Sequence, residues 1–515
     1  MEQSPQESDF EIPPETVHSG ADEASERAAP TGLDMDQPQD STAVVRKRRG
    51  HPVIAWIVIL ALVVLGSGLL SPDAATDGDV EAEDTEASAY QTILELQARY
   101  FIGASKVVGA DPGVFQEQID MFNRGSYRER LCYVVLTGEM LGYEVGQKAL
   151  IQLNANALAA GLELSETDRR LSRTLQQLLT QYISGQWSAE TVDAESRQQL
   201  VAQLQWFGEL ALHPAAVESP ERQQIENDAA ETVSIALVGL SGLTVLFLGG
   251  LVSLFVMTAL SLRGRLTSRL PWSMNGGIYA ETFAVWMLLF FVLSVLVELI
   301  SETSPGLFAN PIQPQFAVSL LSLLAVFWPV IRGVSWSQVR LDAGLSVRGS
   351  WFKEGLFGLL CYATALPLVA LGLLFVVGAG SIPMGQVSFE PTNLPAHPIL
   401  IWIRQASMVE RMQVFLLAAV CAPILEETMF RGFLYRHLRE ATAACRMSTS
   451  ILFSAVFNSL IFAVIHPQGV LAIPALSAMA FGFSLAREWR GNLIAPMTAH
   501  AFNNGAVTTA MILLL

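Results

Sequence analysis

Long apolar runs restrict the folds that are open to this chain. Each run is about as long as a bilayer's hydrocarbon core is thick, and within lipid only helices and closed barrels satisfy their own backbone hydrogen bonds. With 51% hydrophobic and 15% charged residues among 515, a wholly soluble or disordered chain is excluded. The sequence predicts an all-α, polytopic helical membrane bundle with nine spans: 52–70, 232–260, 278–300, 316–331, 355–378, 413–435, 450–466, 470–486 and 493–514.

The net charge excludes one class of function. The chain carries 48 acidic and 31 basic residues, which gives a formal charge of −17. Such a chain repels phosphate-rich polymers, so we expect no nucleic-acid partner. Of the four cysteines, only Cys132 lies in the long polar insert, so that insert has no disulfide framework.

The N-terminal region predicts a tail and an anchor. Residues 1–45 are rich in Glu, Asp, Pro, Ser and Gln and predict a disordered acidic tail. Four consecutive basic residues, 46–49, then precede the first apolar run, which predicts a signal-anchor helix over 46–71 with a cytoplasmic N-terminus. A cleaved signal peptide is the alternative, but the run starts some fifty residues into the chain and no small-residue cleavage site follows.

The remaining chain divides into three parts. Residues 72–230 combine an acidic stretch with helical periodicity and predict an extracytoplasmic acidic helical insert, whose partner the sequence does not identify. Membrane helices occupy 231–412, and 413–515 form a membrane core that contains the polar motifs. Alternate connections between spans carry the basic residues, which predicts a multi-pass protein of the cell (inner) membrane with these connections in the cytoplasm. They are Arg263, Arg265 and Arg269; Arg332, Arg340, Arg348 and Lys353; Arg436, Arg439 and Arg446; and Arg487 and Arg490.

Few ionisable side chains lie inside the apolar runs, and the most unusual are the adjacent Glu426 and Glu427. A charge at membrane depth is costly, so it usually faces the bundle interior and is paired or functional. On a helix Glu427 shares a face with Arg431, whereas Glu426 projects about 100° away. We expect Arg431 to neutralise Glu427 and Glu426 to remain available as a general base; a purely structural, helix-stabilising ion pair between Glu427 and Arg431 is the alternative.

Two further spacings supply groups that could act with Glu426. Phe462 and His466 share one helical face, and so do His500 and Asn504. A carboxylate that takes a proton from water, with imidazole and amide donors for the oxyanion, suits hydrolysis. Alternatively, Glu426, His466 and His500 could hold Zn²⁺ in a catalytic site with an open position; no other cofactor is indicated.

Structural interpretations of the same residues remain open. His466 directly precedes Pro467, as expected for a helix-end residue that binds a freed carbonyl group. Asn504 could join helices through hydrogen bonds, and Phe462 could pack around the site. With the arginines taken as markers of the membrane surface, Glu426 lies about 15 Å along its helix from Arg436, whereas His466 lies about 30 Å along its segment from Arg446. We therefore expect Met447 to Phe453 to lie along the membrane interface and the spanning helix to start near Ser454.

The three motifs together resemble a known family. Glu-Glu-x-x-x-Arg at 426–431, Phe-x-x-x-His at 462–466 and His-x-x-x-Asn at 500–504 occur in this order within apolar segments. They resemble the CPBP family, the CAAX prenyl protease and bacteriocin-processing intramembrane proteases, over about residues 413–515. The resemblance implies an all-helical membrane endopeptidase in which a glutamate-activated water hydrolyses a peptide bond of a membrane-embedded or lipid-linked substrate, with a metal as an open alternative.

Two functions from other classes compete with this one. Glu426, His466 and His500 could form the proton relay of a proton-coupled transporter, because ionisable groups inside membranes often mark such paths. Transporters tend to contain two corresponding halves, and the polar motifs here occur only near the C-terminal end. A non-catalytic membrane scaffold that recruits a partner through the 72–230 insert is the third hypothesis.

Overall fold

The computed structural model describes residues 50–69, 80–185, 192–271, 273–304, 306–310, 312–347, 349–380, 403–404 and 406–515. Every regular element within these ranges is a helix, so the all-α prediction is confirmed for them. The tail predicted over 1–45 lies outside the described residues.

Seven helical segments in the described ranges are long and apolar enough to cross a membrane. They are α9 (Pro220–Leu262), α10 (Gly276–Thr303), α11 to α12 (Ile312–Ile331), α14 (Trp351–Gly380), α16 to α18 (Met408–Ala441), α19 (Met447–Val464) and η8 to α20 (Val470–Arg490). The remaining two predicted spans also fall on helices, α1 (Pro52–Leu69) and α21 (Ile494–Leu514), which are outside this set of seven. The chain is therefore a multi-pass membrane protein, and the number nine stays a prediction.

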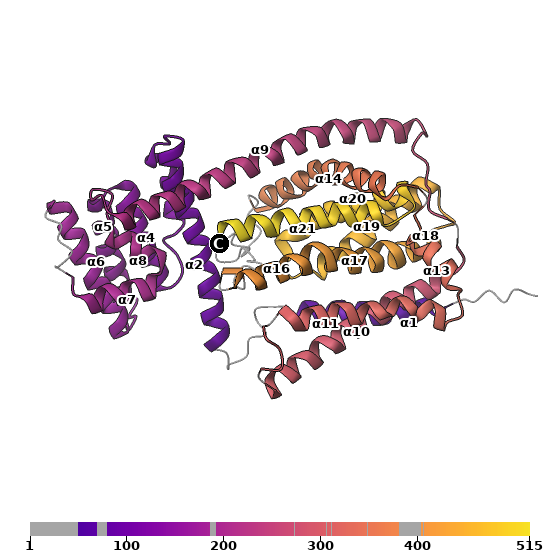
Figure 1. Ribbon diagram of the computed structural model, residues 1–515, viewed down its shortest axis with the longest axis horizontal. Coiled ribbons are helices and arrows are strands. Elements are labelled where there is room, and N and C mark those ends of the chain that lie inside the picture. The colour runs from indigo at the N-terminus through magenta and orange to yellow at the C-terminus, as the bar shows by residue number, and fades with distance from the viewer. Residues whose placement is uncertain are drawn as a thin grey trace, which may run out of the picture. The chain divides into compact units, whose positions relative to one another are not determined.

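The membrane helices pack in two neighbouring groups. Figure 1 shows α14, α20 and α21 side by side, with α19 against α20 and α9 along α14. In the other group, α10 contacts both α1 and α11. α9 packs closely against α14. A Cβ atom added to Gly250 of α9 would lie only 2.0 Å from the carbonyl oxygen of Ala363. Glycine at that position therefore lets the two helix backbones approach directly.

The polar insert contains helices that pack around a core of their own. They are α2 (Val80–Val107), η2 (Pro112–Phe115), α3 (Gln116–Asp120), α4 (Tyr127–Leu141), α5 (Tyr143–Ala159), α6 (Glu166–Ser184), α7 (Ala194–Leu204) and α8 (Trp206–Leu212). Cys132 lies in this core with 1% of its surface exposed, and burial raises the pKa of its thiol. The thiol is therefore inert toward ordinary labelling reagents in the folded protein.

The arginine-rich connections lie together at one end of the bundle. Contacts join all four of them: Arg269 N to Glu488 O (2.9 Å), Ser273 Oγ to Asp342 Oδ2 (2.7 Å), Arg439 Nε to Glu488 Oε2 (3.0 Å) and Arg490 Nη2 to Glu354 Oε1 (2.5 Å). The sequence predicted that these connections share a side, and their proximity agrees with that prediction. The side of the membrane that this end faces stays a prediction.

Residues just before α16 contact the insert. The guanidinium of Arg404 donates from Nη1 to Oγ1 of Thr92 (2.6 Å) and from Nη2 to Oε2 of Glu95 (2.9 Å), and it also contacts Gln205. Thr92 and Glu95 are buried on α2. The insert is thus attached by side-chain contacts to the segment that leads into the glutamate-bearing helix, as well as by the backbone of α9.

The glutamates lie on a helix interrupted by two wider turns. The segment consists of α16 (Met408–Leu416), η6 (Leu417–Cys421), α17 (Ala422–Glu427), η7 (Thr428–Leu434) and α18 (Tyr435–Ala441), and both η6 and η7 are π-type. Pro423 has no N–H to donate to the preceding turn, which is a local cause for the first wide stretch. The π-type stretches flank the two glutamates, a placement often found at functional sites.

The predicted break in α19 is wrong, because α19 is one helix from Met447 to Val464. Its first turns bind α18, where Thr442 Oγ1 lies 2.6 Å from Oγ of Ser450. The error arose from taking Arg436 as a marker of the membrane surface, whereas that side chain is only 4% exposed and α18 continues past it to Ala441. His466, just beyond the end of this unbroken helix, nevertheless reaches Glu426, with its Nε2 atom 3.6 Å from Oε2.

Candidate active site

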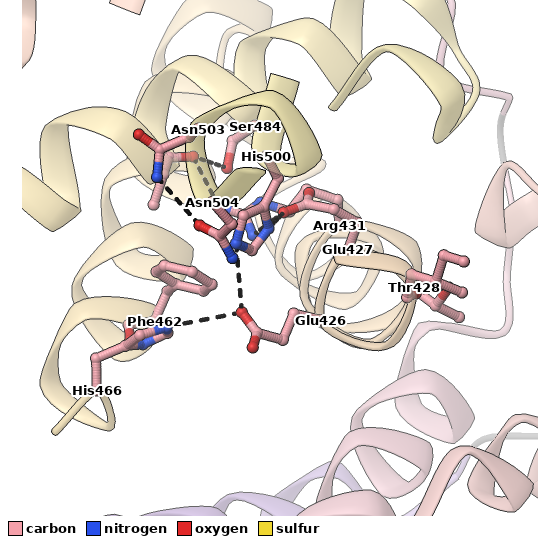
Figure 2. Close-up of polar contacts among 12 residues, drawn as sticks. Glu426, Glu427, Thr428, Arg431, Phe462, His466, Ser484, His500, Asn503 and Asn504 are labelled. Atoms are coloured by element: carbon pink, nitrogen blue, oxygen red, sulfur yellow. Dashed lines mark hydrogen bonds and ion pairs between the residues drawn. The ribbon is translucent and has the colours of Figure 1, made fainter. Parts of the chain in front are cut away.

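Three of the predicted site residues meet inside the bundle. The Oε2 atom of Glu426 lies 3.6 Å from Nε2 of His466 and 3.8 Å from Nε2 of His500 (Figure 2). The exposed fractions of these side chains are 22%, 18% and 5%, so the carboxylate and one imidazole keep a limited opening. Both separations exceed the length of a direct hydrogen bond.

His466 is held by its own helix. Its Nδ1 atom lies 2.5 Å from the carbonyl oxygen of Phe462, one turn earlier, and the two rings are also in contact. Because a carbonyl oxygen only accepts hydrogen bonds, Nδ1 carries the proton and Nε2 is the nitrogen that faces Glu426. His466 therefore fits both interpretations: its Nδ1 atom binds a carbonyl group at the helix end, and its Nε2 atom faces the site.

Glu427 binds two partners through a single oxygen. Its Oε1 atom accepts from Nη1 of Arg431 at 2.8 Å, the pairing that the helical spacing predicts, and lies 2.9 Å from Nδ1 of His500. Glu427 and Arg431 are fully buried. Sequence reasoning missed the contact with His500, because helical spacing reports neighbours on one helix and not neighbours between helices. Glu427 thereby fixes the ring of His500 with Nε2 directed at Glu426.

Arg431 lies within a cage of phenyl rings. Its Cζ atom is 4.6 Å from the ring centre of Phe462, 5.4 Å from that of Phe483 and 5.8 Å from that of Phe430. Its Nη2 atom also donates to the carbonyl oxygen of Ala480 at 3.1 Å. Cation–π contacts in a desolvated environment stabilise a buried guanidinium. Arg431 therefore joins η7, α19 and α20 around the site.

The amide of Asn504 binds the backbone of a neighbouring helix. Its Nδ2 atom donates to the carbonyl oxygen of Ala418 at 2.9 Å, and its Oδ1 atom accepts from Asn503 at 3.1 Å. These contacts join α21 to η6, as the alternative interpretation of Asn504 as a link between helices predicts. Asn504 lies close to His500 on the same helix (Figure 2), but its amide is engaged elsewhere in this arrangement.

A fourth helix, α20, contributes to the site, and the three motifs gave no indication of it. Ala480 supplies the carbonyl oxygen that Arg431 binds, and Phe483 stacks on His500 with ring centres 5.5 Å apart and planes 28° apart. Neither residue is polar, and one of them acts through its backbone. A search for ionisable groups inside apolar runs cannot find such residues.

The charges of the site do not cancel within its own residues. Two carboxylates, Glu426 and Glu427, face one guanidinium, that of Arg431. Within the described ranges, Oε2 of each glutamate has no hydrogen-bond partner. These two oxygen atoms can therefore accept a hydrogen bond from a protonated imidazole, a bound water molecule or a substrate group.

The donor types of Glu426, His466 and His500 match the preference of Zn²⁺ for nitrogen and oxygen ligands. In the arrangement of the described residues, however, no group of three His, Cys, Asp or Glu side chains is placed to hold a metal ion. We derive no chemical step through a metal centre.

The comparisons with known proteins bear on this part of the chain. Residues 409–506 match the family model described as type II CAAX prenyl endopeptidase Rce1-like. No curated protein and no solved structure matched the chain. The matched range contains Glu426, Glu427, His466, His500 and Asn504. The segment that forms the site is therefore similar to the Rce1-like CAAX prenyl endopeptidases.

Proposed function

We propose that the chain is an intramembrane endopeptidase in which Glu426 activates a water molecule. The observation that carries the proposal is the convergence of two imidazole Nε2 atoms on one carboxylate oxygen, at 3.6 and 3.8 Å, within an Rce1-like membrane domain. Hydrolysis needs a base, a water molecule and a group that stabilises the oxyanion. The carboxylate can act as the base, and an imidazole can stabilise the oxyanion.

The hydrogen-bond inventory favours a water molecule between these groups. The Nδ1 proton of His466 points away, toward Phe462, so Nε2 of neutral His466 and Oε2 of Glu426 are two acceptors that face each other, while His500 carries a proton on both nitrogens, with Nδ1 on Glu427. Acceptors repel unless a donor lies between them. A water molecule there can donate one hydrogen to Glu426 and one to an imidazole, which also orients a lone pair of its oxygen toward a substrate.

The proposed reaction then balances in two steps. Glu426 takes one proton from the water as the water oxygen bonds to the scissile carbonyl carbon, which leaves a negative charge on the carbonyl oxygen. As the C–N bond breaks, protonated Glu426 donates that proton to the leaving nitrogen, and the products are an acid and an amine. The His500 imidazolium, stabilised at Nδ1 by Glu427, is placed to donate from Nε2 to the oxyanion.

The other predicted residues support this arrangement. Arg431 neutralises Glu427 and holds the three helices together, Phe462 packs on both imidazoles, and Asn504 fixes η6 against α21. Asn504 remains a proposed oxyanion donor only if its amide rotates from Ala418 when substrate binds. Zn²⁺ held by Glu426, His466 and His500 is the competing mechanism.

The substrate class follows from where the site lies. A site inside a helical membrane bundle is reached by a membrane-embedded or lipid-linked peptide, and we propose such a peptide or protein as substrate. The 72–230 insert, placed outside the cytoplasm by the positive-inside rule, is proposed to meet a further partner, and the protein is assigned to the inner membrane with a cytoplasmic N-terminus.

A cleavage assay tests the proposed class of function. The purified full chain, in detergent or vesicles, is incubated with a library of membrane-anchored peptides, and new termini are mapped by mass spectrometry. A protease produces new termini at defined bonds. A transporter or a scaffold produces none, and that outcome would overturn the proposal.

A further inference from the structure

We propose that Phe483 of α20 is a positioning residue of the active site, one that fixes the ring plane of His500 through direct stacking. The proposal rests on the proposed function, because it assigns a role within that site. It starts from an asymmetry between the two imidazoles. His466 is held by a backbone carbonyl on its own helix, whereas the Nδ1 contact of His500 is to Glu427, a side chain that is shared with Arg431.

One hydrogen bond leaves a ring free to rock about its axis. The Nδ1 contact of His500 sets the direction of one ring atom, but the angle of the ring plane determines where Nε2 points. Phe483 lies face to face with His500, with planes 28° apart, whereas Phe462 meets it edge-on at 74° and 5.9 Å. A stacked face and an edge from different helices together remove the remaining rotation.

Phe483 is itself held firmly. Its side chain is 1% exposed and belongs to a small core cluster with Tyr362 and Leu366 of α14 and Ala499 of α21. The same ring lies 5.4 Å from Cζ of Arg431. Phe483 therefore packs against α14 and also contacts Arg431 and His500, the two partners of Glu427. Displacement of Nε2 by even a fraction of an ångström would weaken its hydrogen bond to the reacting group.

The test removes the ring while keeping the bulk. In the full-length protein, Phe483→Leu and Phe483→Met lose the stacked face, and Phe483→Tyr keeps it. Phe433→Leu is the matched control, because Phe433 is also fully buried in the bundle and its ring contact is with Tyr279. We expect kcat for peptide cleavage to fall roughly tenfold in both ringless variants with KM within about twofold, and to recover in Phe483→Tyr.

A purely structural role predicts a different pattern. In that case Phe483→Leu and Phe433→Leu would lose thermal stability to a similar degree, and kcat per folded molecule would be unchanged in both, which would overturn the proposal. Equal loss of kcat in Phe433→Leu would overturn it as well.

A second readout does not depend on cleavage. Diethyl pyrocarbonate modifies accessible imidazole nitrogens, and peptide mass spectrometry reports the extent at His500. We expect faster modification of His500 in both ringless variants and unchanged modification in the Phe433 control. If the wild type cleaves nothing but this reactivity changes as expected, the proposed function fails while the positioning role stands. Unchanged reactivity at His500 in the ringless variants would contradict the positioning role itself.

Discussion

Nδ1 of His500 lies 2.9 Å from Oε1 of Glu427, the same oxygen that Arg431 binds at 2.8 Å. The second glutamate of the pair is therefore not only the counter-ion of an arginine on its own helix. It also orients an imidazole that faces the first glutamate. The adjacent carboxylates act on two sides of one ring, Glu427 at Nδ1 and Glu426 at Nε2.

Glu427→Gln should cost both stability and activity. It leaves the fully buried Arg431 without its carboxylate, and breaking a buried pair in this way costs about 3–5 kcal/mol. It also weakens the hold on His500, so cleavage should fall in the protein that remains folded. Thermal unfolding in detergent, with cleavage measured per folded molecule, checks both effects. Glu298→Gln, which changes an exposed carboxylate on α10, is the control and should alter neither.

Replacing both members of the pair separates those two effects. Glu427→Gln combined with Arg431→Met removes the stranded charge, so much of the lost stability should return, while His500 stays poorly held and cleavage stays low. The same two assays apply. Recovery of cleavage together with stability would show that Glu427 acts only through Arg431.

The contact of Arg404 with the insert should control local motion. Arg404→Gln removes the charge that Glu95 and Thr92 bind, so we expect faster amide hydrogen exchange around residues 92–95 and in the first turn of α16. Arg170→Gln, which loses an exposed ion pair with Glu195, should leave exchange at those positions unchanged. Equal exchange in wild type and Arg404→Gln would show that the contact contributes nothing measurable.

Topology can be measured with two cysteines in a background that lacks the others. Cys445 is exposed and adjoins the arginine-rich end, and Ala159→Cys places a thiol on an exposed position of the insert. In intact cells an impermeant maleimide should label position 159 and should reach Cys445 only after the membrane is opened. Cys132 is unsuitable as a marker because it is buried in the core of the insert. Labelling of Cys445 alone in intact cells would invert the topology.

Chelation separates the two mechanisms for water activation. If Glu426 acts as the base without a metal, cleavage should persist after extensive dialysis against EDTA or phenanthroline. Elemental analysis of the same sample establishes whether any zinc remains bound. Loss of activity that is restored by Zn²⁺ alone would instead favour a centre formed by Glu426, His466 and His500.

The helical architecture was predictable because apolar length alone determines which segments can cross a bilayer. The pairing of Glu427 with Arg431 was predictable for a similar reason, since four residues bring side chains together on any helix. The alternation of arginines also predicted which connections lie together, and Arg269, Arg439 and Arg490 do lie at one end of the bundle.

Contacts between helices could not be predicted in this way. The depth of His466 was misjudged because Arg436 is buried, so a charged residue in the sequence did not mark the water boundary. The contributions of Ala480 and Phe483 have no polar signature, and the contact of Arg404 with α2 joins residues about three hundred positions apart. Such features depend on tertiary packing, which one sequence does not specify by local pattern.

Glu426→Gln tests whether Glu426 is the base. The amide keeps the shape of the side chain and some hydrogen bonding but cannot take a proton, so cleavage of a defined membrane peptide should fall by at least ~10²-fold. Thermal unfolding of the variant should match the wild type, because Glu426 forms no ion pair with Arg431. Cleavage at the wild-type rate by folded Glu426→Gln, together with an inactive but normally folded Glu427→Gln, would contradict the account and assign the base to Glu427.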